Sequence, residues 1–347
     1  MRDALRRLAD VEPGDLPVLS VYLDLRPQAT GEAPAMRSGL VVLKDRLREI
    51  EKTFPPRGDG LDSFCTDVDR IERFLADDLP AVAQGLALFA CAGRDLFETV
   101  EAGVAFDNQV SAGPAPDLFQ LARLLDEQET SVVAVVDSNT ARLFVARVGR
   151  LREVEGEDRD SKYSRNRSSM GGWSQSSYQR HNAEVRTAFA RDTAAAITQL
   201  VERENAVRVV LAGDEVAITP LRKALPPTVT ALLEEILRID IRTPRAEVAQ
   251  EVLPLLAQVE ADEAQTHADR LVEAVRGSRL APAGVAATLE ALAHGRADLV
   301  LLDPDALEDA TRSELVRLAS TTGAELEIVE GHERLRRMGG VGALLRW

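Results

Sequence analysis

The chain lacks the features that mark membrane, secreted and zinc-binding proteins. No run approaches the roughly 20 consecutive apolar residues of a membrane-spanning helix, and the amino-terminal residues are not followed by an apolar stretch. Cysteine occurs only at Cys65 and Cys91, without the paired spacing of a zinc site or a disulfide framework. We therefore expect a cytoplasmic protein with no membrane contact and two ordinary thiols.

Histidine is also scarce, and no metal or cofactor is expected. His267, His294 and His332 are scattered, and no Ser/His/Asp or metal-ligand set can be defended from their spacing. His181 has two interpretations, an RNA contact or proton shuttle and an exposed residue at a helix start. Asp137 follows a strand, where Asp-Ser-Asn is typical of a turn that hydrogen-bonds its own backbone rather than of a catalytic carboxylate.

Positive charge is in deficit, with 42 Lys and Arg against 57 Asp and Glu and a net charge of -15. Such a chain should repel phosphate over most of its surface, so any RNA contact must be local. In one segment the local net charge is positive instead. Residues 161–183 contain no acidic side chain but include Lys162, Arg165, Arg167 and Arg180.

Inside this basic segment lies the pair Gly171-Gly172, followed by Trp173-Ser174-Gln175. Adjacent glycines permit positive φ angles and remove two side chains, so the main chain can approach another molecule closely. Trp173 would fit a loop that packs down against the protein, whereas the serines on both sides favour an exposed, flexible loop. The segment is therefore the leading candidate site.

The 347 residues are enough for two or three domains, and strands interleaved with helices predict an α/β class. We place the domain boundaries at 1–125, 126–243 and 244–347. In the first domain, strands are expected at 18–25 and 85–91 and helices near 36–54, 61–75 and 118–127.

In the middle domain, strands at 131–136 and 141–146 form a hairpin, and a charged edge strand at 152–160 leads into the Gly-Gly loop. A long helix follows, with Val185, Phe189, Ala196, Ile197 and Leu200 on one side. A strand at 207–212 and a short helix at 218–225, beginning near Pro220, complete this domain.

The last domain begins with helical sequence from about 244 to 276, which Pro254 should kink or interrupt. A helix at 284–292, a strand at 297–302, a helix near 313–319 and a strand near 325–329 follow. In the closing segment, Gly339, Gly340 and Gly342 fit a tight turn into a last strand better than a phosphate cradle.

Three of these segments, in this order, resemble the archaeo-eukaryotic class-1 peptide-chain release factors. The hairpin, basic Gly-Gly loop, long helix and strand 209–213 resemble the family's middle domain. The sequence around 284–300 and the ending 339–347 resemble its ribosomal-protein-like carboxyl-terminal domain, an α/β/α layer. Within this superfamily, the bacterial branch called family ten looks most similar, through Val21-Tyr22-Leu23-Asp24 and the Gly-Gly-Trp-Ser-Gln loop. The Vms1-like rescue factors are relatives of that branch. The ending of the chain also resembles that of the hibernation factor Balon.

The resemblance implies that the loop enters the ribosomal peptidyl transferase centre, where water cleaves the ester between nascent peptide and tRNA. Gly171, Gly172, Trp173 and Gln175 would be catalytic, a main-chain N–H stabilising the developing oxyanion. Lys162, Arg165, Arg167, Arg180 and His181 would bind rRNA and tRNA phosphates.

The sequence departs from the family at two places. Trp173 occupies the position of the family's glutamine, and Gln175 follows two residues later. The stop-codon motifs Asn-Ile-Lys-Ser and Tyr-Cys-Phe are absent from the first domain, so the expected action is independent of the codon.

The expected function is therefore rescue of stalled ribosomes by hydrolysis of peptidyl-tRNA from the A site, by a monomer without cofactor. A translational GTPase is an open candidate for delivery. The alternative is a non-enzymatic hibernation factor whose loop occupies the transferase centre. A nuclease acting on tRNA or other RNA, or a protein-interaction module, is a third hypothesis.

Overall fold

The computed structural model describes residues 1–26, 35–79, 83–126, 129–154, 175–277 and 281–346, without the side chains of residues 35–38, 175–183 and 235. Its contacts divide the chain into two compact units: Met1–Asp126 with Ala264–Trp347, and Glu127–Glu263. We call these the first and second units and describe each by itself. The three-domain division made from the sequence stays a prediction.

An antiparallel sheet in the order β3-β2-β1-β4 forms the centre of the amino-terminal part of the first unit. Its strands are β1 (Val18–Asp24), β2 (Gly85–Cys91), β3 (Leu96–Ala102) and β4 (Gln109–Gly113). Helices α2 (Ala35–Glu51) and α3 (Asp59–Asp77) cover one face through an apolar cluster that includes Val21, Leu43 and Ile71. The predicted strands and helices here are present, but α1 (Arg2–Ala9), β3 and β4 were not predicted.

Tyr22 fixes the opposite face of this sheet. Its ring is fully buried edge-on to Phe89 and Phe106, and its hydroxyl donates a 2.5 Å hydrogen bond to the Asp117 carbonyl. Burial raises the pKa of Tyr22 well above its ordinary value, with the Asp117 charge acting in the same direction. The bond ties β1 to the residues just before α4 (Phe119–Asp126), and Tyr22 is therefore a structural residue.

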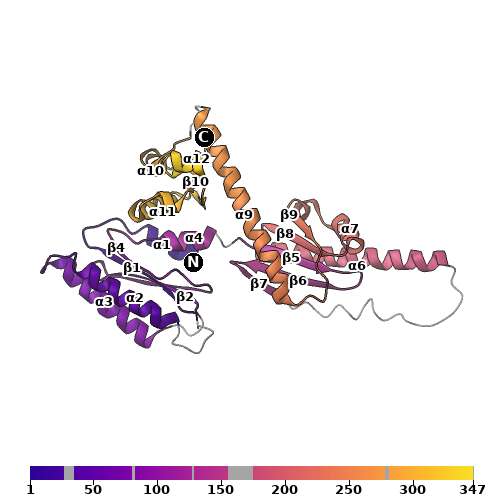
Figure 1. Ribbon diagram of the computed structural model, residues 1–347, viewed down its shortest axis with the longest axis horizontal. Helices are drawn as coiled ribbons and strands as arrows, with labels where there is room; N and C mark the ends of the chain where they lie inside the picture. The colour runs from indigo at the N-terminus through magenta and orange to yellow at the C-terminus, as the bar shows by residue number, and fades with distance from the viewer. Residues whose placement is uncertain (27–34, 80–82, 127–128, 155–174, 278–280, 347) are drawn as a thin grey trace. The chain divides into compact units, whose positions relative to one another are not determined.

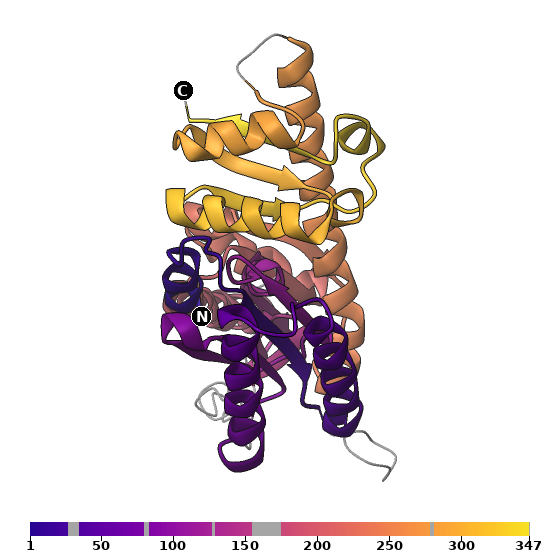
Figure 2. The same ribbon diagram turned by 90° about the vertical axis from the view of Figure 1, so that its left-hand side faces the viewer.

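The carboxyl-terminal part of the first unit is a three-layer α/β/α arrangement. Strand β10 (Ala297–Leu302) lies between β11 (Glu325–Ile328), parallel to it, and β12 (Val341–Leu345), antiparallel to it. Helices α10 (Val285–Ala293) and α11 (Asp309–Thr322) pack on these strands (Figure 2). The last part of α9 (Arg245–Arg276) and α12 (Glu333–Arg337) share an apolar cluster with β10. The sequence predicts this layer correctly.

The glycines near the end of this layer form a tight turn and pack closely against their neighbours, as the sequence predicts for the turn. Gly339 and Gly340 have φ angles of 95° and 73°, a conformation that other residues rarely adopt. A Cβ on Gly340 would lie 2.5 Å from the Ala306 side chain, and one on Gly342 would lie 2.7 Å from that of Leu271. The glycines allow β12 to enter the sheet beside these neighbours.

The second unit is a mixed sheet in the order β7-β6-β5-β8-β9. Strands β5 (Ser131–Val136), β6 (Ala141–Arg147) and β7 (Arg150–Val154) form an antiparallel meander, and β8 (Arg208–Gly213) and β9 (Leu233–Leu237) add in parallel beside β5. Helices α6 (Gln175–Glu204), α7 (Glu215–Ala224) and α8 (Pro227–Thr230) contribute to the core on one face, and α9 contributes Val248 and Val252 on the other (Figure 1).

Prolines lie inside two helices. Helix α7 begins at Glu215 and contains Pro220 in its interior, so the predicted start near Pro220 was wrong. Helix α9 runs through Pro254, which therefore does not interrupt it, and the predicted kink there stays a prediction. A helical proline leaves the carbonyl four residues earlier without its usual donor. Here those carbonyls belong to Val216 and Gln250, both exposed residues whose carbonyls water can reach.

An ion triad holds α9 to the second unit. Buried Arg208, the first residue of β8, contacts Glu129 before β5 and Glu263 in α9. Burial works against the charge of the guanidinium, but the two glutamates outweigh it and raise the pKa of Arg208. Removing one partner would leave a buried charge uncompensated, which is why such pairs resist substitution.

Asp67, in α3 of the first unit, is a carboxylate buried in the protein with one oxygen that accepts no hydrogen bond from the described residues. It is completely buried, Ser63 Oγ lies 3.5 Å from its Oδ2, and its Oδ1 has no hydrogen-bond partner among those residues. Burial raises its pKa to about 6, against the opposing effects of the Ala92 amide, Arg70 and Ser63.

We expect Asp67→Asn to stabilise the protein at pH 8 but not at pH 4. Because the folded-state pKa is raised above the ordinary 3.8, the wild-type contribution is fully present below about pH 4 and is lost as pH rises through 6. The gain at pH 8 should be at most about 3 kcal/mol in urea unfolding. Exposed Asp69→Asn on the same helix is the control; equal curves for wild type and Asp67→Asn at both pH values would contradict the assignment.

Candidate functional site

The Gly-Gly segment joins β7 to α6. Strand β7 ends at Val154 and α6 begins at Gln175. Lys162, Arg165, Arg167, Gly171, Gly172 and Trp173 lie in residues 155–174, outside the described residues, as does most of the strand predicted at 152–160. Gln175, Arg180 and His181 belong to α6, but their side chains are also outside the description, so their predicted roles stay predictions.

Helix α6 extends well beyond the sheet that anchors it (Figure 1). Among its described side chains, the first buried one is Phe189, fourteen residues after Gln175. At 1.5 Å per residue, this stretch is about 21 Å long. The helix therefore holds the end of the Gly-Gly segment about 20 Å from the first buried contact.

The anchored half of α6 is built from small and apolar residues. Of the predicted stripe, Phe189, Ile197 and Leu200 are buried, and Val185 and Ala196 are half-buried. The prediction missed three buried positions that complete the contact face: Ala190, Thr193 and Ala194. Alanine at two of them lets the helix backbone approach β5 and β8 closely, and the stripe continues to Val201.

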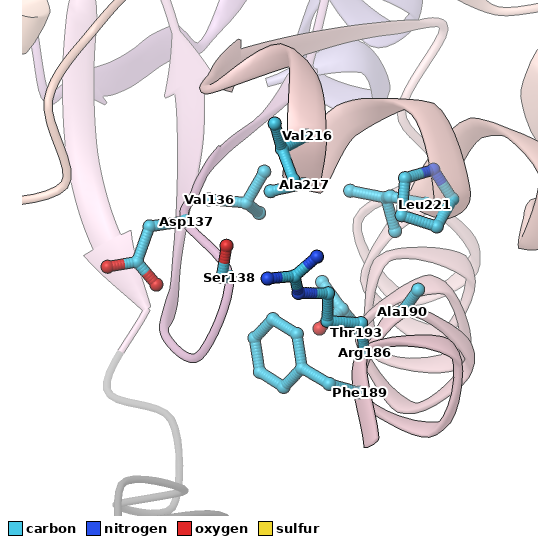
Figure 3. A pocket seen from close by; sticks show the side chains of 11 residues that line it. Val136, Asp137, Ser138, Arg186, Phe189, Ala190, Thr193, Val216, Ala217 and Leu221 are labelled. Atoms are coloured by element: carbon cyan, nitrogen blue, oxygen red, sulfur yellow. The ribbon is translucent and has the colours of Figure 1, made fainter. Parts of the chain in front are cut away.

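A hollow of about 270 Å³, including solvent at its mouth, lies where the carboxyl end of β5 meets α6 and α7 (Figure 3). Its lining is mainly apolar, with Phe189, Ala217 and Leu221 contributing, and Figure 3 shows the Arg186 side chain reaching toward Ser138. Ligand pockets usually enclose 300–1,000 Å³. This open hollow is too small for a typical small-molecule site.

Asp137, which lines the hollow, uses its side chain to stabilise a turn. Its Oδ1 accepts hydrogen bonds from the amides of Asn139 at 2.7 Å and Thr140 at 2.6 Å. Its own amide donates to the Thr140 carbonyl at 3.0 Å. The interpretation of Asp137 as a turn residue rather than a catalytic carboxylate is confirmed.

Gly213 makes the closest backbone approach at this edge of the sheet. Its φ is +135°, and a Cβ there would lie 1.8 Å from the Val136 carbonyl oxygen at the end of β5. The obstacle is backbone, which cannot move aside as a flexible side chain would. Only glycine lets β8 end beside β5 and turn directly into α7.

We expect Gly213→Ala to destabilise the second unit by at least about 3 kcal/mol in urea unfolding, because the clash and the positive φ act together. The matched control is Gly103→Ala, where nothing lies within 4 Å of the added methyl group. Its effect should stay within about 0.5 kcal/mol. A Gly213→Ala protein as stable as the control would show that β5 and β8 end differently.

The histidines whose side chains are described have structural partners. His267 Nδ1 lies 2.7 Å from Glu327, His294 Nδ1 lies 2.7 Å from the Glu290 carbonyl, and His332 caps α12 by accepting from the Leu335 amide. Within the described ranges, no three His, Cys, Asp or Glu residues are grouped as metal ligands. None of the helices there combines the length and apolar composition needed to cross a bilayer.

Comparison with solved structures gives matches of low identity and low TM-score. An archaeal translation termination factor, aRF1, is 15% identical, with 100% of this chain and 98% of that chain covered and a TM-score of 0.28. Archaeal Pelota, from a model of its ribosome-bound complex with ABCE1, is 16% identical over 100% and 94%, with a TM-score of 0.46. Dom34 of S. cerevisiae is 11% identical over 73% and 74%, with a TM-score of 0.43.

The chain matches none of the curated proteins. A protein-family model, however, matches residues 116–256, which include the whole mixed sheet, α6 and the segment between β7 and α6. That model is described as bacterial archaeo-eukaryotic release factor family 10. Residues 116–256 of the chain are therefore similar to bacterial archaeo-eukaryotic release factor family 10.

Proposed function

We propose that this chain is a codon-independent ribosome rescue factor that enters the A site and promotes hydrolysis of peptidyl-tRNA. The observation that carries the proposal is α6, whose first residue, Gln175, lies about 20 Å along the helix from Phe189, the first buried residue among its described side chains. The family match to the same residues supports it. A long stalk ending in a glycine pair suits a site at the bottom of a narrow tunnel or cleft.

The chemistry proposed for the loop is ester hydrolysis. A water oxygen attacks the ester carbonyl carbon, the bond to the tRNA 3′ oxygen breaks, and the tRNA hydroxyl and peptide carboxylic acid are released. Backbone N–H groups around Gly171, Gly172 and Trp173 stabilise the negative charge on the carbonyl oxygen. Gln175 orients the loop or the water from its displaced position.

Basic residues of the same segment position the loop. Lys162, Arg165, Arg167, Arg180 and His181 contact rRNA and tRNA phosphates in this proposal. The chain as a whole has a net charge of -15, so attraction to RNA must be local rather than spread over the protein. The partners are the ribosome and its P-site tRNA, and the protein acts in the cytoplasm as a monomer, with delivery by a translational GTPase left open.

The second candidate is a hibernation factor that occupies the transferase centre without hydrolysis. Trp173 favours it, because an indole in the position of the family's glutamine enlarges the loop where water would have to approach. Both candidates require ribosome binding. They differ only in whether the ester is cleaved.

We expect the purified chain to release labelled peptide from ribosomes that carry peptidyl-tRNA in the P site. Replacing Gly171 and Gly172 together by alanine should slow release about 10²- to 10³-fold, because the backbone donors lose their close approach. Release that survives Gln175→Ala would assign the chemistry to the main chain. Ser176→Ala with Ser177→Ala is the control for two small changes beside the loop.

Ribosome sedimentation at graded salt separates the remaining outcomes. Tight binding without release in the wild type would replace the enzyme by the hibernation factor. No binding even at low salt would remove both candidates, since both depend on contacts to RNA phosphates.

A further inference from the structure

The hollow at the carboxyl end of β5 has walls from three elements of the second unit. Val136 and Ser138 come from β5 and the turn after it, Arg186 and Phe189 from α6, and Val216 from α7. Its volume of about 270 Å³, which includes solvent at the mouth, suits one apolar side chain rather than a whole small molecule. Pockets filled by a single anchor side chain are typical of the centres of protein–protein contacts.

The rim that α7 contributes is apolar. Val216 is 58% exposed, which is unusually open for a large apolar side chain in the described part of the chain. Half-buried Pro220 lies one turn further along the same helix and also lines the hollow. An apolar occupant would remove both side chains from water, and this burial is the main favourable term available at the rim.

Pro220 also leaves a main-chain acceptor beside the hollow. Proline has no N–H, so the carbonyl of Val216, four residues earlier, lacks the donor that an α-helix ordinarily supplies. Proline is strongly unfavourable in a helix interior, so the stability of α7 does not explain this residue. A main-chain N–H of an occupant can donate to the Val216 carbonyl oxygen.

The positive charge in the hollow comes from Arg186. Figure 3 shows its guanidinium group among the lining side chains, with the Asp137 carboxylate turned away from it. Among the described residues, no carboxylate forms an ion pair with Arg186. Ser138 and Thr193, which also line the hollow, add a hydroxyl group each. The hollow therefore combines an apolar interior with a cation at its side.

These groups suit a ligand whose negative charge and apolar side chain are close together. In an extended peptide, neighbouring side chains point to opposite faces, so an acidic residue next to an apolar one would direct its carboxylate away from the hollow. At a carboxyl terminus, the carboxylate is attached to the same Cα as the last side chain. One apolar terminal residue therefore supplies the side chain, the carboxylate and a main-chain N–H together.

We propose that the hollow is a docking site for the carboxyl terminus of a partner protein that ends in an aliphatic residue. Arg186 binds the terminal carboxylate through paired hydrogen bonds. Phe189 and Leu221 contact the aliphatic side chain, and the Val216 carbonyl accepts the last main-chain N–H. The site goes beyond the proposed ribosomal function and does not rest on it, although a partner bound here would contact α6, the helix that leads to the Gly-Gly segment.

The charges around Val216 favour a peptide over a nucleic acid. Asp214 and Glu215, both exposed, precede Val216 at the start of α7. An RNA strand carries a charge at every nucleotide and would be repelled by these carboxylates. A carboxyl terminus brings a single negative charge, which one arginine can pair.

The test compares two probes that differ only in their last group. The peptide acetyl-Gly-Ser-Gly-Leu with a free carboxyl terminus, and the same peptide with a terminal amide, are titrated into the full chain and followed by saturation-transfer NMR. We expect a dissociation constant of about 1 mM for the acid, because a single anchor residue carries the contact. The amide should bind at least about tenfold more weakly, since a hydrogen bond to a charged group is lost.

Substitution of Arg186 tests the carboxylate contact. Arg186→Ala should remove the preference for the acid, so that both peptides bind about equally weakly. Arg186→Lys should keep part of the preference, because the charge stays and paired hydrogen bonding is lost. Arg191→Ala removes an exposed arginine from the same helix, outside the lining, and should leave both affinities unchanged.

Substitution of Val216 tests the rim. Val216→Asp should weaken binding of the acid at least about tenfold, because it replaces an apolar contact by a like charge. The matched control is Val41→Asp on α2, where the side chain is 59% exposed, and it should leave binding unchanged. Thermal unfolding of each variant verifies that it is folded.

Equal affinity of the wild type for acid and amide would overturn the proposal, as would a wild type that binds neither peptide or an unchanged preference in Arg186→Ala. Arg186→Ala that weakens binding of a mixed-sequence hairpin RNA but not of the peptide would assign Arg186 to nucleic acid and also overturn it. Acid-selective peptide binding without ribosome binding would retain the docking site and remove the rescue function. Peptide release on the ribosome with equal affinities for acid and amide would do the reverse.

Discussion

Parallel pairing of β5 with β8 is the constraint on which the second unit depends. The two strands pair in register from Ser131 with Arg208 to Val136 with Gly213. Parallel neighbours cannot be joined by a tight turn, because the chain must first return to the starting edge of the sheet. The return occupies residues 137–207 and contains β6, β7, the Gly-Gly segment and α6. The Gly-Gly segment and the helix that holds it are thus parts of a single crossover.

The two ends of the crossover are stabilised differently. At the carboxyl end of β5, the turn of Asp137 and the close approach of Gly213 to Val136 fix where the strands stop. At the other end, Arg208 joins β8 to Glu129 and Glu263. Because contacts fix the strands at both ends, the sheet between them is a firm base for α6.

In the four-stranded and five-stranded sheets, the sequence predicts the central strands and misses the edge strands β3, β4 and β9. Strands β5 and β8 are continuous apolar runs, Ser131–Val136 and Arg208–Gly213, and both were predicted. Strand β9 is interrupted by Glu234 and Glu235, as suits an edge strand, and β4 has no apolar run; neither was predicted. Pro220 misled the predicted start of α7, because it lies inside the helix and the carbonyl that loses its usual donor belongs to the exposed residue Val216.

The candidate site stays a prediction from the sequence. Glycine pairing and the local reversal of charge pointed to residues 161–183, and the structure adds the length of α6 and the position of its first buried residue, Phe189. No sequence pattern singled out the hollow beside α6. Its lining comes from β5, the turn after it, α6 and α7, and these residues become neighbours only in the folded sheet.

Reach and precision have different sources. A helix held by side chains from Phe189 to Val201 sets the distance to which the loop extends, since the rise per residue is fixed. The glycine pair has more conformational freedom than any other dipeptide and cannot by itself hold an oxyanion donor within the few tenths of an ångström that catalysis demands. In the proposed function, that precision is supplied by the surface of the ribosome against which the Gly171-Gly172 pair would lie.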